Sequence, residues 1–311
     1  PVLAKKWPIG TELNTDRHRC TSLCNLTLHT RDGVIMNRQL LSRAKYGITE
    51  DQRVATAQSW LLAPAQSRGV ALVTAQTATT QRPILLQGFS CISDQVGGTI
   101  NANGLRVAGL SLNAGNQPIP CGVLSPTAFG KEHTTIGIAM NQNSTVTVDA
   151  LQSAAGVFGY SIGCLPIEAA QVPDSADQAD FYNYIVGCGT TGVIAFGGAG
   201  QCQATVLRGC WLGLVSCTNQ LGTGVIANSD WVLTDLTVNG ISMLAGGAGQ
   251  QIQGDFLVPG GQLGGPAQSS VSDFILDYWV EANSTIIFNF TNVSAAANMD
   301  VGAAIFCKPY K

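Results

Sequence analysis

Two histidines and two cysteines near the start of the sequence could bind a metal. They are His18, Cys20, Cys24 and His29, all within twelve positions. Thiolate and imidazole groups are ligands of tetrahedral zinc. The spacing is not that of the common zinc fingers, however, and residues 24–29 alternate between apolar and polar types, which in a strand would turn alternate side chains to opposite faces. A zinc site and a plain strand both stay open, and we prefer the strand.

A second candidate is the sequence Gly-Tyr-Ser-Ile-Gly at 159–163, which matches the G-x-S-x-G nucleophile elbow of hydrolases. That motif needs a helix directly after the serine and a histidine later in the chain. Here Cys-Leu-Pro follows, and the last histidine of the sequence is His133. We therefore expect Ser161 to lie in a strand and to have no catalytic role.

A third candidate is the sequence Gly-Cys-Gly-Thr-Thr-Gly at 187–192, which matches the dinucleotide fingerprint G-x-G-x-x-G. Nucleotide binding requires a strand before the glycines and a helix after them, so that the helix N-terminus faces the pyrophosphate. In this sequence a predicted helix comes first and a predicted strand, 193–196, follows. We interpret 187–192 as a loop.

Five asparagines stand in N-x-S/T sequons, namely Asn25, Asn143, Asn283, Asn289 and Asn292. Such sequons accept glycans in secreted proteins, but a chain rich in Asn and Thr also contains them by chance, which is our interpretation. With three histidines and no cluster of carboxylates, the sequence offers no catalytic site. We expect neither an enzyme nor a bound cofactor.

The elements that carry these residues occur twice in the chain. Residues 49–113 resemble residues 175–239 at a constant offset of 126. The matching stretches are 49–52 with 175–178, 90–91 with 216–217, 98–100 with 224–226, and 110–113 with 236–239. The match resumes as 143–146 with 283–286, at offset 140, and as 164–166 with 307–309, at offset 143. These matches indicate a duplication.

The change of offset from 126 to 140 indicates an insertion of 14 residues in the second copy. We assign it to residues 245–268, which are rich in Gly and Pro. The stretch is predicted to be an exposed loop that can be deleted without unfolding the protein. Its apolar piece, 256–259, would contact a neighbouring molecule.

The repeat is the size of a domain and predicts three parts: an N-terminal arm at 1–48, a first domain at 49–168 and a second domain at 169–311. A capping box opens each copy, at Thr49 with Gln52 and at Ser175 with Gln178, and predicts short helices at 53–62 and 179–186. About eight short runs rich in β-branched residues follow in each copy. The expected fold class is all-β, with a short helix in each domain.

The composition is unusually poor in charge. Hydrophobic residues make up 45% of the chain and charged residues 11%, against roughly 25% charged residues in typical soluble proteins. Interface cores are depleted in charge, so the composition suits a chain that buries surface against neighbours; an ordinary β-rich domain is the other interpretation. The ten cysteines contain no C-x-x-C pair and are expected to be reduced. No apolar run is long enough for a membrane span or an uncleaved signal peptide.

Positive charge is concentrated at the start of the sequence. Residues 1–82 hold 11 of the 16 Lys and Arg residues and 5 of the 19 Asp and Glu residues. A basic segment before an acidic body is typical of contact with a polyanion or an anionic membrane, although a solvated basic face is the alternative. Apolar residues beside lysines favour the membrane over nucleic acid. The candidate membrane-facing residues are Leu3, Lys5, Lys6, Trp7, Arg17 and Arg19.

Two tandem eight-stranded β-domains behind an arm, with little charge and one longer loop, resemble the double jelly-roll major capsid proteins of tailless, membrane-containing icosahedral bacteriophages and adenovirus-like viruses. The resemblance covers residues 49–311 and is architectural, with no diagnostic motif. It implies two tandem jelly-roll barrels in each chain. It also implies a homotrimeric capsomer with pseudo-sixfold symmetry.

The resemblance further implies where such a protein works and what it contacts. The partners would be neighbouring capsomers, minor capsid and penton proteins, and an inner membrane met through the arm, with no sequence-specific nucleic-acid binding. The protein would be made in the host cytoplasm and reside in the virion. The alternative function is a tandem β-sandwich lectin or adhesin at a cell surface, which would need a signal peptide, paired cysteines and exposed aromatic platforms.

Overall fold

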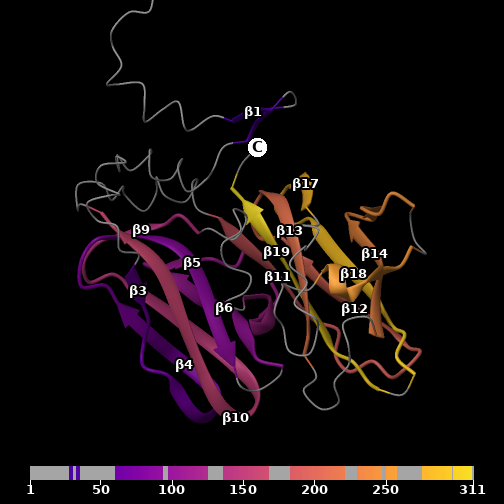
Figure 1. The fold of residues 1–311 in the computed structure, drawn as a ribbon, viewed down its shortest axis with the longest axis horizontal. Coiled ribbons are helices and arrows are strands. Elements are labelled where there is room, and N and C mark those ends of the chain that lie inside the picture. The colour runs from indigo at the N-terminus through magenta and orange to yellow at the C-terminus, as the bar shows by residue number, and fades with distance from the viewer. Residues whose placement is uncertain are drawn as a thin grey trace, which may run out of the picture. The chain divides into compact units, whose positions relative to one another are not determined.

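The computed structural model describes residues 28–30, 33–35, 60–93, 97–124, 136–167, 183–220, 230–246, 250–257, 275–295 and 297–309. Over these residues the protein is all-β with antiparallel strand pairing in every sheet, as the sequence predicted (Figure 1). The chain divides into two compact units, Pro1–Ala55 and Thr56–Lys311. In the smaller unit, β1 (Leu28–Thr30) and β2 (Gly33–Ile35) form a hairpin. The predicted boundaries after residues 48 and 168 stay predictions.

Residues 60–166 of the larger unit form one eight-stranded sheet around a long central strand. Its elements are β3 (Trp60–Leu62), β4 (Ser67–Thr79), β5 (Ile84–Ser93), β6 (Thr99–Val107), β7 (Leu110–Ser111), β8 (Ile119–Pro120), the 3₁₀ helix η1 (Cys121–Leu124), β9 (Ala139–Met140) and β10 (Thr145–Pro166). The first part of β10 pairs with β4 and β6, and its second part pairs with β3 and β5. We call this region the first half.

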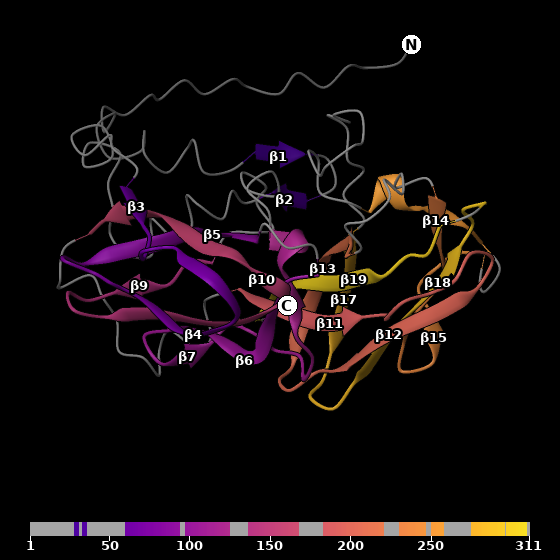
Figure 2. The same ribbon diagram turned by 90° about the horizontal axis from the view of Figure 1, so that it is seen from below.

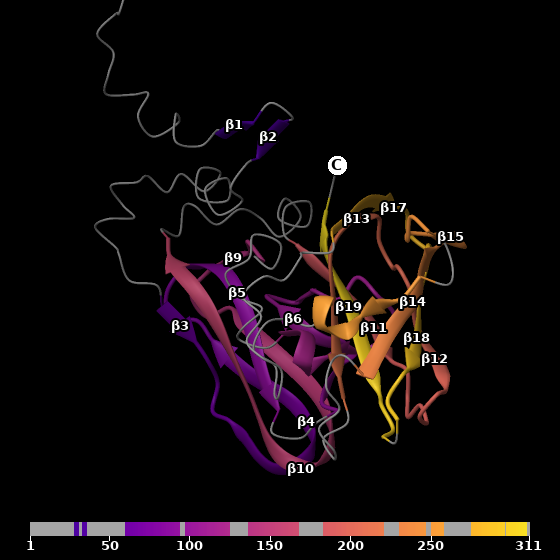
Figure 3. The same cartoon turned by 45° about the vertical axis from the view of Figure 1, so that its right-hand side comes forward.

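Residues 184–308 form two separate sheets, which we call the second half (Figure 3). One sheet has the order β11-β19-β13-β17 and the other has the order β12-β18-β14-β15, with β16 also on β14. The bounds are β11 (Tyr184–Thr190), β12 (Ala199–Thr205), β13 (Cys210–Asn219), β14 (Trp231–Val238), β15 (Ile241–Ser242), β16 (Ile252–Gln253), the 3₁₀ helix η6 (Gly254–Phe256), β17 (Ile275–Val280), β18 (Thr285–Asn292) and β19 (Val301–Lys308).

The core of the second half comes from the two-residue period of its strands. Along β18 every second residue is buried, which places Ile286, Phe288 and Phe290 on the inner face. The rings of Phe288 and Phe290 stack at 6.0 Å between centroids, and Trp231 meets Phe290 edge-on at 5.6 Å. Most buried apolar residues of both halves belong to one continuous cluster.

Strand register is consistent with the predicted duplication of the chain. Ser90 pairs with Ser161 in the first half, and Ser216 pairs with Ala304 in the second, as offsets of 126 and 143 require. The turns before β10 and β18 agree as well, because Asn143 before β10 and Asn283 before β18 both have positive φ values, of 64° and 69°. Both halves also have a register shift at the corresponding place, next to Leu86 and Leu212.

Two of the matches at offset 126 are wrong. Ile100 pairs with Ile119, and Leu233 pairs with Ile252, in hairpins that lead into η1 and η6. Ile100 therefore corresponds to Leu233, 133 residues later, and not to Ile226. The match of 110–113 with 236–239 is a chance similarity between residues that lie at different registers, since Val107, and not Leu112, corresponds to Val238. Residues 224–226 lie outside the described part of the chain.

The prediction that residues 245–268 form one exposed loop, which can be deleted without unfolding the protein, is also wrong in part. Residues 252–253 form β16, and Leu257 is buried with its carbonyl accepting the backbone N–H of Cys217 at 2.9 Å. The extra residues are thus divided between two connections, one before β14 and one after η6. Deleting the whole stretch would remove part of the core. Phe256 is exposed, as predicted for a contact piece, and residues 258–268 lie outside the described part of the chain.

The helices predicted at 53–62 and 179–186 extend too far toward the C-terminus. Residues 60–62 and 184–186 are strands, because their backbones pair with β10 and β19 and this long-range pairing outweighs local helix propensity. Residues 187–190, predicted as part of a loop, continue β11. The rest of both predicted helices, with their capping boxes, lies outside the described residues.

Candidate assembly surfaces

The two halves meet through a main-chain contact, which we call the seam. The seam segment is residues 112–124, and it lies along β11 of the second half (Figure 2). The Ala114 N–H donates to the Ile185 carbonyl at 2.8 Å, and the Ile185 N–H donates to the Leu112 carbonyl at 2.9 Å. The segment therefore adds a short parallel strand to the outer edge of β11.

One buried side chain holds the seam segment in register. The Asn113 Oδ1 accepts the N–H of Gly115 at 2.8 Å and that of Gly187 at 3.0 Å, and its Nδ2 donates to the Gln117 carbonyl at 2.7 Å. This one amide accepts hydrogen bonds from two buried backbone N–H groups and donates to a third, partly buried backbone group. Asn113 thus joins both halves through hydrogen bonds.

Close approach at the seam depends on glycines. A Cβ on Gly187 would lie 2.7 Å from the carbonyl oxygens of Gln117 and Pro118. A Cβ on Gly302, in β19, would lie 2.5 Å from the Cγ of Pro120. The end of the seam segment, β8 and η1, therefore packs directly on the backbone of the sheet formed by β11, β19 and β13.

The outer face of β4 and β10 in the first half is almost free of charge. Thr77 and Thr147 pair across the strands with their hydroxyl oxygens 3.2 Å apart. Further along the same two strands, Leu72 pairs directly with Leu151, and both side chains are exposed. Exposed neutral surface that carries large apolar side chains is typical of contact with another macromolecule.

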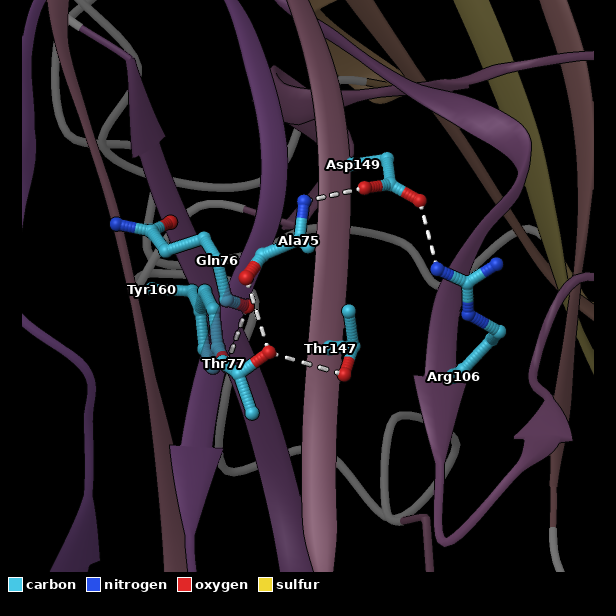
Figure 4. A network of polar contacts seen from close by, with 7 residues as sticks. All are labelled: Ala75, Gln76, Thr77, Arg106, Thr147, Asp149 and Tyr160. Atoms are coloured by element: carbon cyan, nitrogen blue, oxygen red, sulfur yellow. Dashed lines mark hydrogen bonds and ion pairs between the residues drawn. The ribbon is translucent and has the colours of Figure 1, made fainter.

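Among the described residues, Arg106 and Asp149 form an ion pair within this sheet (Figure 4). Asp149, on β10, lies between β4 and β6 where the register of both neighbours shifts. Its Oδ2 binds the Arg106 guanidinium at 2.8 Å, and its Oδ1 accepts the N–H of Ala75 at 2.6 Å. Ala75 has a φ of 47°, so the carboxylate supports a bulge in β4. The charges of Arg106 and Asp149 therefore offset one another.

Tyr160 ties the strands together beneath this face. Its hydroxyl donates toward the carbonyls of Gln76, at 3.1 Å, and Val146, at 2.8 Å, and accepts the N–H of Ala78 at 3.1 Å. The ring stacks on Phe89 at 5.4 Å. Burial raises the pKa of the Tyr160 phenol well above its ordinary value, so the phenol stays protonated and remains a donor.

The eight described cysteines are all buried, and none of them forms a disulfide. They are Cys91, Cys121, Cys164, Cys188, Cys202, Cys210, Cys217 and Cys307. Burial raises the pKa of the Cys164 thiol to about 11 and that of Cys217 well above its ordinary value. Thiols in such surroundings are poor nucleophiles.

We therefore expect these eight cysteines to resist alkylation in the folded protein. Iodoacetamide at pH 8 should label them only after unfolding, because all eight side chains are buried and out of reach of the reagent. Peptide mapping by mass spectrometry reads each site separately. Rapid native labelling of Cys217 would show that the second half opens.

The burial of Asp300, just before β19, leads us to expect that the stability of the protein depends on pH. Burial is the main cause that raises its pKa above 3.8, although the Thr191 hydroxyl donates to its Oδ1 at 3.3 Å and lowers it. The folded state therefore binds this proton more tightly than the unfolded state, and stability falls as the pH rises through the interval above 3.8. Asp300→Asn should raise the melting temperature at pH 7, and the gain should vanish near pH 3. A gain that is equal at both pH values would contradict this.

The residues proposed from the sequence as sites are mostly outside the described part of the chain. This holds for Leu3, Lys5, Lys6, Trp7, Arg17 and Arg19, and for His18, Cys20 and Cys24. The backbone of His29 lies in β1. Among the described residues no cluster of His, Cys, Asp and Glu could hold a metal.

The remaining motifs have structural explanations. Ser161 lies within β10, opposite Ser90, with no helix after it, so the nucleophile elbow is excluded. Asn292 is fully buried and cannot carry a glycan. Sequence reasoning missed the exposed apolar residues Leu61, Leu72 and Leu151. All three lie in strands, and only the strand register shows that their side chains face outward.

No protein-family model matches the chain, and no curated protein matches it at a significant level. Over the described residues we find no helix with the length and apolar character needed to cross a bilayer.

Proposed function

We propose that the protein is a structural capsid protein built from two jelly rolls. A jelly roll is an eight-stranded antiparallel ribbon wrapped into two facing sheets, so its first strand pairs with its eighth, its second with its seventh, and so on inward. The second half follows this rule: β11 pairs with β19, β12 with β18, β13 with β17, and β14 with β15 and β16. This pairing is the observation that carries the proposal.

The first half supports the same interpretation with one difference. There β3 and β4 both pair with β10, β5 pairs with β9, and β6 pairs with β7 and β8. The single strand β10 takes the place of the seventh and eighth strands, which merges the two sheets into one. The proposed fold is therefore a tandem double jelly roll.

The relative direction of the halves supports a ring-shaped assembly. A Cβ on Gly97, in the connection after β5, would lie 3.3 Å from the carbonyl of Gln220, directly after the corresponding strand β13. Corresponding connections of the two halves thus lie next to each other, as in two units related by rotation. Three chains with six such units would give a trimer with pseudo-sixfold symmetry.

The distribution of charge supports burial of the larger unit among copies of itself. Its described residues include only five basic side chains: Arg68, Arg82, Arg106, Arg208 and Lys308. Large neutral surfaces suit permanent interfaces between subunits. The partners we propose are other copies in the trimer, neighbouring capsomers, and minor capsid and penton proteins, all within a virion assembled after synthesis in a host cell.

Native mass spectrometry and electron microscopy of the purified protein test this proposal. We expect a homotrimer whose projection has six similar lobes. A protein that stays monomeric at tens of micromolar concentration, with no assemblies at any salt concentration, would contradict it.

We also propose that the basic residues of the N-terminal arm contact an inner membrane of the virion. Each Lys or Arg near an anionic leaflet contributes roughly 1 kcal/mol to binding. Trimers should co-sediment with anionic vesicles at low salt, and removal of residues 1–12, which contain Lys5, Lys6 and Trp7, should weaken this binding. Binding that is unchanged by truncation or by salt would refute the role of the arm.

One observation favours the alternative function of a glycan-binding lectin or adhesin. Trp211 and Trp279 pair across β13 and β17 with ring centroids 6.3 Å apart. Their indole N–H groups donate to the carboxylates of Asp277 and Glu281 near the protein surface. Such a pair could stack on sugar rings. Glycan-array binding that is lost in Trp211→Ala would support this alternative, whereas the absence of binding would leave the capsid proposal.

A further inference from the structure

Each half also carries a counterpart of one side of the seam, and the described residues of the chain leave both counterparts exposed. At the seam, residues 112–124 of the first half cover β11, β19 and β13 of the second half. Because the chain is duplicated, the second half has its own version of the seam segment at residues 243–257. Likewise, the first half has its own version of the covered surface on β3, β10 and β5, which we call the open face.

Strand register identifies the corresponding residues. In the first half, Trp60 pairs with Cys164, and the next residue, Leu61, pairs with Gly163. In the second half, Tyr184 pairs with Cys307, and the next residue, Ile185, pairs with Phe306. Leu61 therefore corresponds to Ile185. In the same way, Val123 is the third residue of η1, Phe256 is the third residue of η6, and the two elements follow corresponding strands.

Burial differs sharply between these corresponding residues. Ile185 is 5% exposed and Val123 is 0% exposed, because the two halves cover them at the seam. Their counterparts Leu61 and Phe256 are 79% and 50% exposed. The duplication has thus kept a large apolar residue at both positions, while only one of the two contacts is made within the chain.

The backbone of the open face has room for a second segment. In the seam, Pro120 lies over Gly302. The counterpart of Gly302 is Gly159, where the nearest atom to a Cβ position is the Cγ of the Gln66 side chain, at 3.3 Å. Around Gly163, four residues further along β10, no atom of the described residues lies within 4 Å of a Cβ position. The small residues of the sequence Gly-Tyr-Ser-Ile-Gly therefore leave the strand surface open.

We infer that residues 243–246 and 250–257 of one copy dock on the open face of a second copy and repeat the seam between chains. Phe256 of one copy would occupy the place that Val123 has in the seam, and Leu61 of the next copy would be covered as Ile185 is. The contact joins two different surfaces, so it is heterologous and either closes into a ring or continues as a filament. This inference rests on the proposed capsomer, in which the ring closes after three copies.

The test uses full-length variants that disrupt one surface at a time. Leu61→Asp places a charge on the open face. Phe256→Asp places a charge on the segment that docks there, which we call the docking segment. Each should be monomeric, with the dissociation constant raised at least about 30-fold, as expected when a central apolar residue of an interface is lost. Val193→Asp is the matched control, because Val193 is also an exposed apolar residue, at 66%, and lies in a loop outside both surfaces; this variant should remain trimeric.

An equimolar mixture of Leu61→Asp and Phe256→Asp provides the decisive measurement. One variant has an intact docking segment and the other has an intact open face, so the mixture should form one-to-one dimers that cannot grow further. Native mass spectrometry with one variant isotope-labelled reads this directly. The dimers would also show that both variants are folded.

The outcomes separate this inference from the proposed function. If the wild-type protein is a trimer and both variants remain trimers, or if the mixture gives no dimer, the inference is wrong and the trimeric capsomer stands. If the wild-type protein is monomeric at all concentrations, the capsomer proposal itself fails, and the inference fails with it.

Discussion

Trp231→Ala is expected to lower the free energy of unfolding by about 3–5 kcal/mol, the usual cost of deleting a fully buried aromatic side chain. Trp231 is 0% exposed and packs edge-on against Phe290 at the centre of the second half. The strands around it are paired along their length, so the cavity cannot collapse. Chemical denaturation followed by fluorescence and circular dichroism measures the loss.

Trp231→Phe is the control for this prediction. The indole N–H of Trp231 is buried without a hydrogen-bond partner among the described residues, so phenylalanine removes an unsatisfied donor while it keeps an aromatic ring next to Phe290. We expect less than half of the loss seen for alanine. Equal losses in both variants would mean that the N–H has a partner after all.

Asn113→Ala is expected to cost about 2–5 kcal/mol, because it leaves the buried N–H groups of Gly115 and Gly187 without their acceptor, at about 1–3 kcal/mol each. The loss should appear as faster hydrogen exchange at both amides, since the seam opens first. Thermal unfolding by calorimetry and exchange measured by mass spectrometry check the two effects.

Asn116→Ala is the matched control on the same segment. The Oδ1 of Asn116 also accepts a backbone N–H of the second half, from Thr205 at 2.8 Å, but this bond is at the surface, where water replaces it. We expect a cost within about 1 kcal/mol. If both variants lost the same stability, the buried amide would not be what holds the seam.

The sequence predicted the fold class because its signals are local and repeated. Alternating apolar residues marked β18, and the pair of serines at 90 and 216 fell at corresponding positions in the sheets. The short matches that failed, such as 110–113 with 236–239, share residue types common to all strands. Only hydrogen-bond register separates them, and register depends on partners far away in the chain.

The candidate surfaces could not be predicted for a related reason. Leu61 and Ile185 are both apolar residues in corresponding strands, and nothing in the sequence near them shows that only Ile185 is covered. Likewise, Asn113 stands in a sequence that resembles a turn, and its role depends on Gly187, 74 positions later. Long-range contacts decide which of two similar residues is buried.

The pairing of first strands with last strands determines how the chain can fold while it is being synthesised. Trp60 pairs with Cys164, so the first half cannot close until more than a hundred further residues have left the ribosome, and such distant contacts form slowly. The second half begins differently, because Ile185 binds residues 112–114 of a half that is already complete. The folded first half can therefore bind β11 before β19 has been synthesised. The two halves then fold in the order in which they are synthesised.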